Sequence, residues 1–322
     1  MNKKTTILVA VFNKKETIVN CVESLLNLDS PPARLLFLDG GSTDGTYQIL
    51  EKEYKNKIDL IQLPISHSER MNWALDNINT EYTALTDADC VVEPDWLTEL
   101  LKGFSEEKNI VATAGYCGTP KKTSFLQKLI GMDMDNRFDN LPRYLCRAPT
   151  MNLCFRTDIA RNVKFDEKQK VAIETDFGFR LSKHGKILYV PKSKVWHYHR
   201  SDLKSYFNQQ KNQAKWGPRL ILKHKQRAIS DPITGLGMTI QIPLLMAGIV
   251  FLFLSLFNQI FIYFAIVSFS ILLSIYIKNI VKINPSPLYY LILPFFFLYR
   301  TFAWTIGVIE GSFLLLLDKS LR

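Results

Sequence analysis

The chain has 322 residues, of which 47% are hydrophobic, and its 40 Lys and Arg against 30 Asp and Glu give a net charge of +10. Residues 232–277 contain no charge, and this stretch is too long for a buried helix of a soluble protein. The composition excludes a purely soluble protein and an intrinsically disordered one. Five cysteines without a CxxC pair disfavour a disulfide framework or a zinc ribbon and are typical of a reducing cytosol.

The first 110 residues alternate short apolar runs with helical patterns. We expect buried strands over residues 5–12, 34–38, 58–63 and 82–86, and helices over residues 15–28, 45–54 and 68–78. The first helix carries Val19, Val22, Leu25 and Leu26 on one face. Strands that alternate with helices predict an α/β domain with a mostly parallel sheet covered on both faces.

Polar side chains follow three of the predicted strands. Asn13 follows the first strand, Asp39 the second, and Asp87 and Asp89 the last. Because the carboxyl ends of parallel strands meet at one edge, where such domains bind ligands, we expect a polar ligand there. The first strand is not followed by GxGxxG and no P-loop sequence occurs, which disfavours dinucleotide-binding and P-loop proteins.

Two small clusters could carry chemistry at this edge. The carboxylates of Asp87 and Asp89 at i and i+2 require a cation or a shared proton, and their oxygens suit Mg²⁺ or Mn²⁺; the alternative is a loop with an Asx turn. His197 and His199 share one face of a predicted strand and offer a third ligand.

A second acidic cluster, Glu174-Thr175-Asp176, begins a short helical pattern. These acids either stabilise the positive end of that helix or include a general base for a hydroxyl nucleophile.

With these residues the chain resembles the family 2 glycosyltransferases of the GT-A fold, a Rossmann-like α/β fold, over most of residues 5–200. Residues 9–16 look like the nucleotide-binding strand and turn of the family, which implicates Val11, Asn13 and Glu16. The run from Asp39 to Thr46, DGGSTDGT, is similar to the signature whose first Asp contacts the nucleotide base.

Further motifs of the donor site follow in family order. Arg70-Met71-Asn72 resembles the turn over the donor, which implicates Arg70 and Asn72. Asp87-Ala88-Asp89 looks like the DxD motif, so the resemblance implies that Asp87 and Ala88 contact the nucleotide sugar and that Asp89 binds the metal. His197 matches the downstream metal-binding His of the family. The resemblance implies a UDP- or GDP-sugar donor with Mg²⁺ or Mn²⁺.

The acceptor side is implied by two later motifs. Residues 152–156 resemble a segment near the sugar and acceptor, which implicates Asn152 and Arg156. Residues 174–180 are similar to the element that carries the catalytic base. That role is carried over to Glu174, with Asp176 as the alternative.

We expect three parts in the chain: a catalytic domain over residues 1–200, basic juxtamembrane helices over 201–231, and a transmembrane region over 232–322 with two or three spans. From Arg200 to Ser230 there are eight Lys and Arg and one acid. This charge fits a solvated helix or an anionic leaflet, and its position next to the apolar region favours the leaflet over nucleic acid. The prediction is a multi-pass cell-membrane protein with a cytoplasmic catalytic domain.

The apolar region itself predicts two spans, over residues 236–257 and 260–277. A third segment, residues 287–317, is one tilted span or a re-entrant hairpin that returns Lys319 and Arg322 to the cytoplasm. An ionisable group at membrane depth is a candidate functional residue. Arg300 would meet a lipid phosphate or extend to the interface.

These features predict an inverting glycosyltransferase that moves a sugar from a nucleotide diphosphate sugar to a lipid-linked polyprenyl saccharide in glycan or polysaccharide assembly. The alternatives are a polyprenyl-phosphate sugar synthase and a non-catalytic subunit of a membrane glycan complex. Residues 213–216, QAKW, match the QxxRW motif of processive members poorly, which disfavours a processive synthase.

Overall fold

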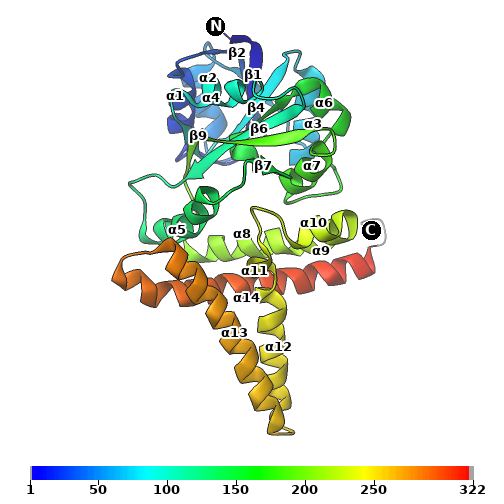
Figure 1. The fold of residues 1–322 in the computed structure, drawn as a ribbon. Helices are drawn as coiled ribbons and strands as arrows, with labels where there is room; N and C mark the ends of the chain where they lie inside the picture. Colours follow the sequence, from blue (N-terminus) through cyan, green and yellow to red (C-terminus); the bar gives the residue numbers. More distant parts are fainter. Residues whose placement is uncertain (1, 319–322) are drawn as a thin grey trace. The chain divides into compact units, whose positions relative to one another are not determined.

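The computed structural model describes residues 2–318 and divides into two compact units (Figure 1). The first unit holds the chain up to Thr123 and Phe138–Tyr198, and the second holds Ser124–Arg137 and the chain from His199 onward. The second unit thus includes residues 124–137, which the sequence-based division placed in the catalytic domain. Lys319 and Arg322 lie outside the described residues.

The first unit is built on a nine-stranded sheet with the strand order β3-β2-β1-β4-β8-β6-β9-β5, and β7 pairs with β9. The strands are β1 (Asn2–Val11), β2 (Pro32–Asp39), β3 (Asp59–Gln62), β4 (Tyr82–Asp87), β5 (Cys90–Val92), β6 (Ile110–Gly118), β7 (Tyr144–Leu145), β8 (Leu153–Arg156) and β9 (Lys186–His197). All four strands predicted in the first 110 residues form, with ends shifted by a few residues.

The sheet is mixed. Strands β1 to β4 are mutually parallel, as predicted, whereas β8 runs antiparallel to both β4 and β6, and β5 and β7 run antiparallel to β9. Strand β9 pairs with β6 in the parallel sense. The predicted parallel arrangement therefore holds for β1 to β4 only. Because β8 runs antiparallel to β4, the first residue of β8 lies near the carboxyl end of β4.

Helices cover both faces of this sheet (Figure 1). Along β1, Ile7 and Val9 pack into the core under α1, α2 and α4, while Leu8 packs on the opposite face under α3, α6 and α7. This alternation is the period of two that a strand buried on both faces requires. The helices are α1 (Ile18–Leu26), α2 (Thr46–Tyr54), α3 (His67–Asn77), α4 (Trp96–Gly103), α6 (Thr157–Val163) and α7 (Ile173–Leu181), with the 3₁₀ helix η1 (Thr150–Asn152) before β8.

Helix α1 differs in detail from its prediction. Val22 and Leu25 are buried, but Val19 is 37% exposed and Ile18 and Cys21 complete the buried face instead. The helix begins at Ile18 rather than at residue 15, because residues 13–17 form the turn that leaves β1. The buried face therefore begins one residue earlier than predicted, at Ile18 in place of Val19.

The second unit is helical. It contains α5 (Phe125–Asp139) as far as Arg137, then α8 (Leu203–Lys215), α9 (Gly217–His224), α10 (Gln226–Ile229), α11 (Leu236–Thr239), α12 (Gln241–Leu254), α13 (Ile260–Ile283) and α14 (Pro287–Leu317). Leu236–Leu254, Ile260–Ile283 and Pro287–Leu317 are long and apolar enough to cross a membrane. The third segment is one continuous helix with Pro294 inside it, so the re-entrant hairpin expected as one alternative does not form.

Candidate active site

The carboxyl ends of β1, β2 and β4 bring the predicted donor residues to one edge of the sheet. In the parallel register Val11 lies beside Asp39, and Ala10 lies between Leu38 and Asp87. Val11 is buried and its carbonyl accepts a hydrogen bond from the Gly40 amide at 2.8 Å. The turn after each of these strands therefore begins at the same edge, as predicted.

Asp39 organises the loop that follows β2. Its side chain is fully buried, and one carboxylate oxygen accepts hydrogen bonds from the Gly41 and Ser42 amides and from Gln62 Nε2 at 2.9–3.0 Å. The other oxygen accepts one from Ser42 Oγ at 2.5 Å. Both oxygens are engaged in these bonds, so Asp39 holds the loop in shape, and its contact with a nucleotide base stays a prediction.

Asn13 joins the turn after β1 to the same loop. Its φ of 51° is in the left-handed region, which asparagine adopts more readily than most residues. Its amide donates to Ser42 Oγ and its Oδ1 accepts from the Thr43 amide, both at 2.9 Å. Glu16 is exposed in the same turn. Asn13 thus sets the relative position of two loops that could cradle a nucleotide.

Arg70 lies over the glycine loop, but Asn72 does not. A Cβ at Gly40 would lie 2.4 Å from Arg70 Nη1, so only glycine lets the guanidinium approach. Asn72 is buried and exchanges hydrogen bonds with the backbone of Phe165 and with Glu167 Oε1 at 2.7–2.9 Å. Arg70 therefore lies beside the loop where the donor is predicted to bind, whereas both amide hydrogens of Asn72 are used to fix a neighbouring loop.

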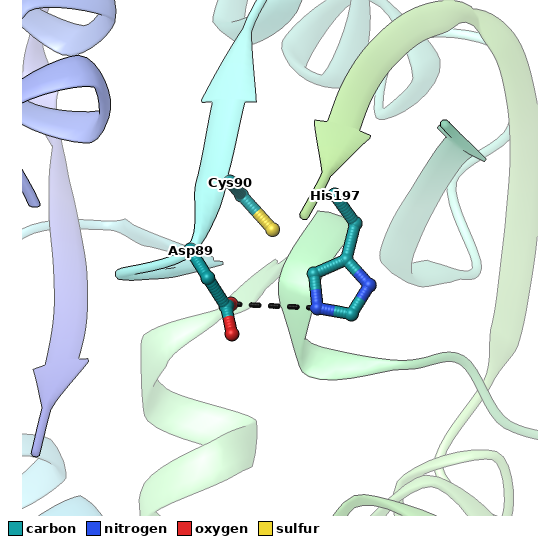
Figure 2. Close-up of side chains that lie close together, drawn as sticks. All are labelled: Asp89, Cys90 and His197. Atoms are coloured by element: carbon teal, nitrogen blue, oxygen red, sulfur yellow. Dashed lines mark ion pairs between the residues drawn. The ribbon is translucent and has the colours of Figure 1, made fainter. Parts of the chain in front are cut away.

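Asp89, the second DxD carboxylate, meets His197 where β4 turns into β5 (Figure 2). Strand β5 pairs with β9 so that Cys90 lies opposite His197. Asp89 Oδ1 is 3.5 Å from His197 Nε2, and Asp89 Oδ2 forms an ion pair with Lys14 Nζ. Sequence reasoning missed Lys14, although its place one residue after Asn13, at the carboxyl end of β1, could have revealed it.

The surroundings of this cluster shift the pKa values of its two carboxyl groups in opposite directions. Burial and the neighbouring Asp89 charge raise the pKa of Asp87 to about 6. Burial also opposes ionisation of Asp89, but His197 and Lys14 outweigh it and hold the pKa of that carboxyl well below its usual range. Asp89 is therefore an anion that a cation already neutralises.

A divalent ion fits this donor set. Asp89, Cys90 and His197 present their ligand atoms within 4.8 Å of one another. Cys90 is 1% exposed, and burial raises the pKa of its thiol well above the usual value, so that it stays protonated. The carboxylate and the imidazole remain as ligands, a combination that Mn²⁺ accepts readily.

Helix α7 places Glu174 at the same edge. Glu174 is partly exposed, burial raises its pKa, and the Arg147 guanidinium opposes that rise. Its charge in turn raises the pKa of Asp87. A Cβ at Gly178 would lie 2.6 Å from Arg147 Cβ, so this glycine, one turn after Glu174, allows α7 to dock against Arg147. No sequence signal had marked Arg147.

Asp176, the alternative base, forms an ion pair with Arg180. It is fully buried, and its Oδ2 accepts hydrogen bonds from Arg180 Nε at 2.8 Å and Nη2 at 2.6 Å. Neither acid caps the helix through its side chain, since the N-cap is Ala172. Of the two acids, Glu174 is the one that can accept a proton from a ligand.

Ala88, predicted to contact the nucleotide sugar, and Asn152, predicted to lie near the acceptor, are both buried close to this edge. Ala88 is buried and its carbonyl accepts from Thr17 Oγ1 at 3.0 Å. Asn152 is fully buried and bonds to Trp96 Nε1 and to the carbonyls of Tyr116 and Ser193 at 2.9–3.0 Å. Its side chain therefore joins core elements and does not face an acceptor.

Arg156 lies at the opposite edge of the sheet. Because β8 is antiparallel to β4, Arg156 is opposite Tyr82, the first residue of β4, whereas Asp87 is the last. At about 3.3 Å per residue the two ends of β4 are about 16 Å apart. The guanidinium lies over the Tyr82 ring, so the structure does not bring Arg156 together with the carboxylates beside which the motif predicts it.

Arg300, the predicted lipid-phosphate ligand, is also enclosed. In the helical unit it is 2% exposed, its Nη1 is 2.7 Å from Asp133 Oδ2, and its guanidinium lies over the Phe297 and Trp304 rings. His199 is buried in the same unit, where its carbonyl accepts from Gln127 Nε2 at 2.7 Å, so it does not share a site with His197. Arg300 therefore has a protein carboxylate as its partner, and neither a lipid phosphate nor the interface is needed.

The model of the family described as Glycosyl transferase family 2 matches residues 6–168, just over half of the chain. The chain belongs to that family. A teichoic acid poly(glycerol phosphate) polymerase of Staphylococcus epidermidis is 25% identical to this family 2 glycosyltransferase over 189 residues, 56% of this chain and 26% of that protein. A poly-beta-1,6-N-acetyl-D-glucosamine synthase of the same species is 20% identical over 228 residues, 68% of this chain and 55% of that protein. The family 2 glycosyltransferase thus spans about half or less of these relatives.

Solved structures share the fold of this family 2 glycosyltransferase. The mannosyltransferase PcManGT from Pyrobaculum calidifontis, in complex with GDP-Man and Mn²⁺, has a TM-score of 0.60 and 14% identity, and covers 98% of this chain and 88% of that chain. S. aureus TarS 1–349 in complex with UDP has a TM-score of 0.50 and 15% identity, and covers 96% of this chain and 91% of that chain. The predicted family and GT-A fold are confirmed.

Proposed function

We propose that this protein is a membrane-bound inverting glycosyltransferase that moves a sugar from a UDP- or GDP-sugar to a lipid-linked polyprenyl saccharide, with its catalytic unit in the cytoplasm. The observation that carries the proposal is the edge of the sheet where Asp87, Asp89 and His197 meet a partly exposed Glu174 of raised pKa. Asp89 and His197 suit a cation on a diphosphate, and Glu174 suits the role of proton acceptor.

The donor would bind along the loops after β1 and β2. The loop that Asp39 shapes and the turn fixed by Asn13 would hold the nucleoside, with Asp87 near the ribose. Asp89 and His197 would hold Mg²⁺ or Mn²⁺, which when bound neutralises negative charge on the diphosphate leaving group. Lys14, already on Asp89, supplies a second positive charge near the same group.

Glu174 would then accept the proton of the acceptor hydroxyl. The oxygen attacks the anomeric carbon as the bond from that carbon to the diphosphate breaks, and the nucleoside diphosphate leaves from the opposite face, which inverts the configuration. A raised pKa makes Glu174 a better proton acceptor near neutral pH, and such a base contributes about 10²–10⁴ in rate. A phosphate acceptor, already ionised, would not need it.

The acceptor class is supported by the helical unit and by the relatives. Leu236–Leu254 and Ile260–Ile283 have mean hydropathies of 2.1 and 2.4, so two spans would keep the enzyme at the surface where polyprenyl lipids are found. The two Staphylococcus relatives are named as a teichoic acid poly(glycerol phosphate) polymerase and a poly-beta-1,6-N-acetyl-D-glucosamine synthase. A bare polyprenyl phosphate is the second candidate acceptor, because it is already ionised and would not need Glu174 as a base.

The proposal is tested on the full chain in nanodiscs. UDP- and GDP-sugars are screened with Mn²⁺ for hydrolysis, and then for transfer to a polyprenyl-diphosphate saccharide or to bare polyprenyl phosphate. Asp89→Asn should abolish transfer with unchanged folding. Asp76→Asn is the matched control, because Asp76 also pairs with a lysine, at 2.9 Å, but on the exposed end of α3. Absence of hydrolysis and transfer with every donor would refute catalysis and favour a non-catalytic subunit.

A further inference from the structure

Helix α14 differs from the two other candidate spans in what surrounds it. Half of its apolar window is buried, compared with 17% and 22% for Leu236–Leu254 and Ile260–Ile283. Its neighbours are α8 and α9 on one side and one end of the α12–α13 hairpin on the other (Figure 1). A helix that crosses a membrane beside two others would instead be expected to contact them along their length.

The polar helix α8 is fixed to α14 over its whole length and runs in the same direction. Near the start of α8 the Tyr206 ring stacks on Phe296, with centroids 5.3 Å apart. At its end, Lys215 Nζ is 3.6 Å from Glu310 Oε2, and a Cβ at Gly311 would lie 1.9 Å from the Lys215 carbonyl oxygen. Backbones this close cannot be separated by lipid, so residues 296–311 of α14 lie wherever α8 lies.

Helix α8 cannot lie in the hydrocarbon core. Its outer face exposes Lys204, Asn208, Asn212 and Gln213, and a lysine at the centre of a span is unfavourable by about 2.5–3.5 kcal/mol on insertion scales. The polar face extends along the helix, so no tilt removes it from the lipid. Residues 296–311 are therefore held at a surface where water reaches one side.

The remaining parts of α14 are too short to cross. At about 1.5 Å per residue, residues 287–295 and 312–317 are about 14 Å and about 9 Å long. A hydrocarbon core is about 30 Å thick. No part of α14 that is clear of α8 can reach from one side to the other.

The hairpin meets α14 only near one end of its two helices. Thr301 of α14 bonds to Gln241 Oε1, on the first residue of α12, at 3.0 Å and to Tyr276 Oη, in the last third of α13, at 2.8 Å. The turn at Asn258 lies at the other end of both helices. Helix α14 thus lies across the base of the hairpin, which extends away from it.

We propose that α14 does not span the membrane but lies in the plane of the leaflet that faces the catalytic unit, with lipid acyl chains as the occupant of its exposed face. That face is apolar from end to end, as an in-plane helix requires, with exposed residues at three- or four-residue spacing except between Phe302 and Ile309, where Ile306 is half-buried. Its members are Leu288, Leu291, Phe295, Leu298, Phe302, Ile309, Phe313 and Leu316. The proposal rests on the membrane placement of α12 and α13 proposed above, and it gives the described chain two spans.

Cysteine labelling with an impermeant maleimide in sealed vesicles tests this arrangement. Cys146→Ser removes the one native cysteine that is not buried, and single cysteines are then placed at Asn258, Ser286 and Asp318. We expect Ser286→Cys and Asp318→Cys to react from the side of the catalytic unit and Asn258→Cys from the other. Reaction of positions 318 and 258 from one side, opposite to 286, would overturn the in-plane helix alone. Reaction of 258 and 286 from one side would overturn the membrane hairpin itself.

A depth measurement gives an independent answer. Nitroxides on cysteines at Leu291, Phe302 and Phe313 report their depth through oxygen and nickel accessibility in liposomes. All three face outward, so the fold should tolerate them. An in-plane helix predicts equal depth at the three sites. In a spanning helix positions 291 and 313 would be about 33 Å apart along the axis, with Phe302 deepest, and that profile would overturn the proposal.

Discussion

Asn152 provides the sharpest test of how the site is assigned, because the sequence motif places it near the acceptor and the structure places it in the core. Its three hydrogen bonds of 3.0 Å or less reach the indole of Trp96 and two backbone carbonyls. Replacing it with alanine leaves one buried donor and two buried acceptors without a partner. At about 1–3 kcal/mol for each such group, Asn152→Ala should reduce the free energy of unfolding by about 3–9 kcal/mol.

That loss is a large part of the total stability of a domain, which is about 5–15 kcal/mol. We expect Asn152→Ala to melt far below the wild type in detergent, followed by tryptophan fluorescence. Asn77→Ala is the matched control, since Asn77 is exposed and makes one bond within its own helix, to the Trp73 carbonyl at 2.8 Å. It should change the free energy of unfolding by less than about 0.5 kcal/mol, as surface substitutions usually do.

Kinetics at a temperature where the variant is folded separate the two roles. A structural Asn152 predicts acceptor and donor KM values close to those of the wild type. Should Asn152→Ala melt like Asn77→Ala while its acceptor KM rises tenfold or more, the side chain must be free to bind the acceptor. The burial argument would then be refuted.

Three further outcomes follow from the contacts described. Glu174→Gln should lower the transfer rate by a factor of about 10²–10⁴, and the acid limb of wild-type kcat/KM should lie above the ordinary pKa of a glutamate. Because the pKa of Glu174 is raised in the folded state, its carboxylate destabilises the fold above that pKa. The variant should therefore melt at a higher temperature than wild type at neutral pH and at the same temperature at acidic pH. Lys14→Met should tighten Mn²⁺ binding without donor, measured by electron paramagnetic resonance, because it removes a competing cation from the carboxylate; Lys15→Met, at an exposed neighbour, should not. Arg300→Met alone should destabilise the protein by about 3–5 kcal/mol by stranding a buried charge, and adding Asp133→Leu should recover much of this in thermal melts.

The parts of the fold that could be predicted are those that the local periodicity of apolar residues determines. The alternation of strands and helices in the first 110 residues, and the polar residues that end three of the strands, depend on neighbours in sequence and on the rule that parallel strands share an edge. The order of the motifs then identified Asp89 and His197, which are far apart in sequence. In the structure Asp89 Oδ1 lies 3.5 Å from His197 Nε2. Here the motifs supplied the long-range information.

The misplaced residues share a different cause. The motif spacing predicts Arg156 near the acceptor, but only strand pairing shows that β8 is antiparallel to β4 and carries it to the far edge. The sequence predicts a lipid partner for Arg300 because nothing in it points to Asp133. Hydropathy likewise reports how apolar α14 is and not that polar α8 lies against it, so the number of spans could not be read from composition.

The α12–α13 hairpin sets a limit on what the described chain could do with a long product. A sealed passage for a hydrophilic polymer needs a ring of helices, and here two helices pack against each other, closely enough at Gly248 that an added Cβ would lie 2.7 Å from the Phe269 ring. No lumen exists between them. With α14 in the plane of the leaflet, the two packed helices offer no passage within the described residues, and the proposed activity would extend a glycan on the side where the nucleotide sugar is supplied.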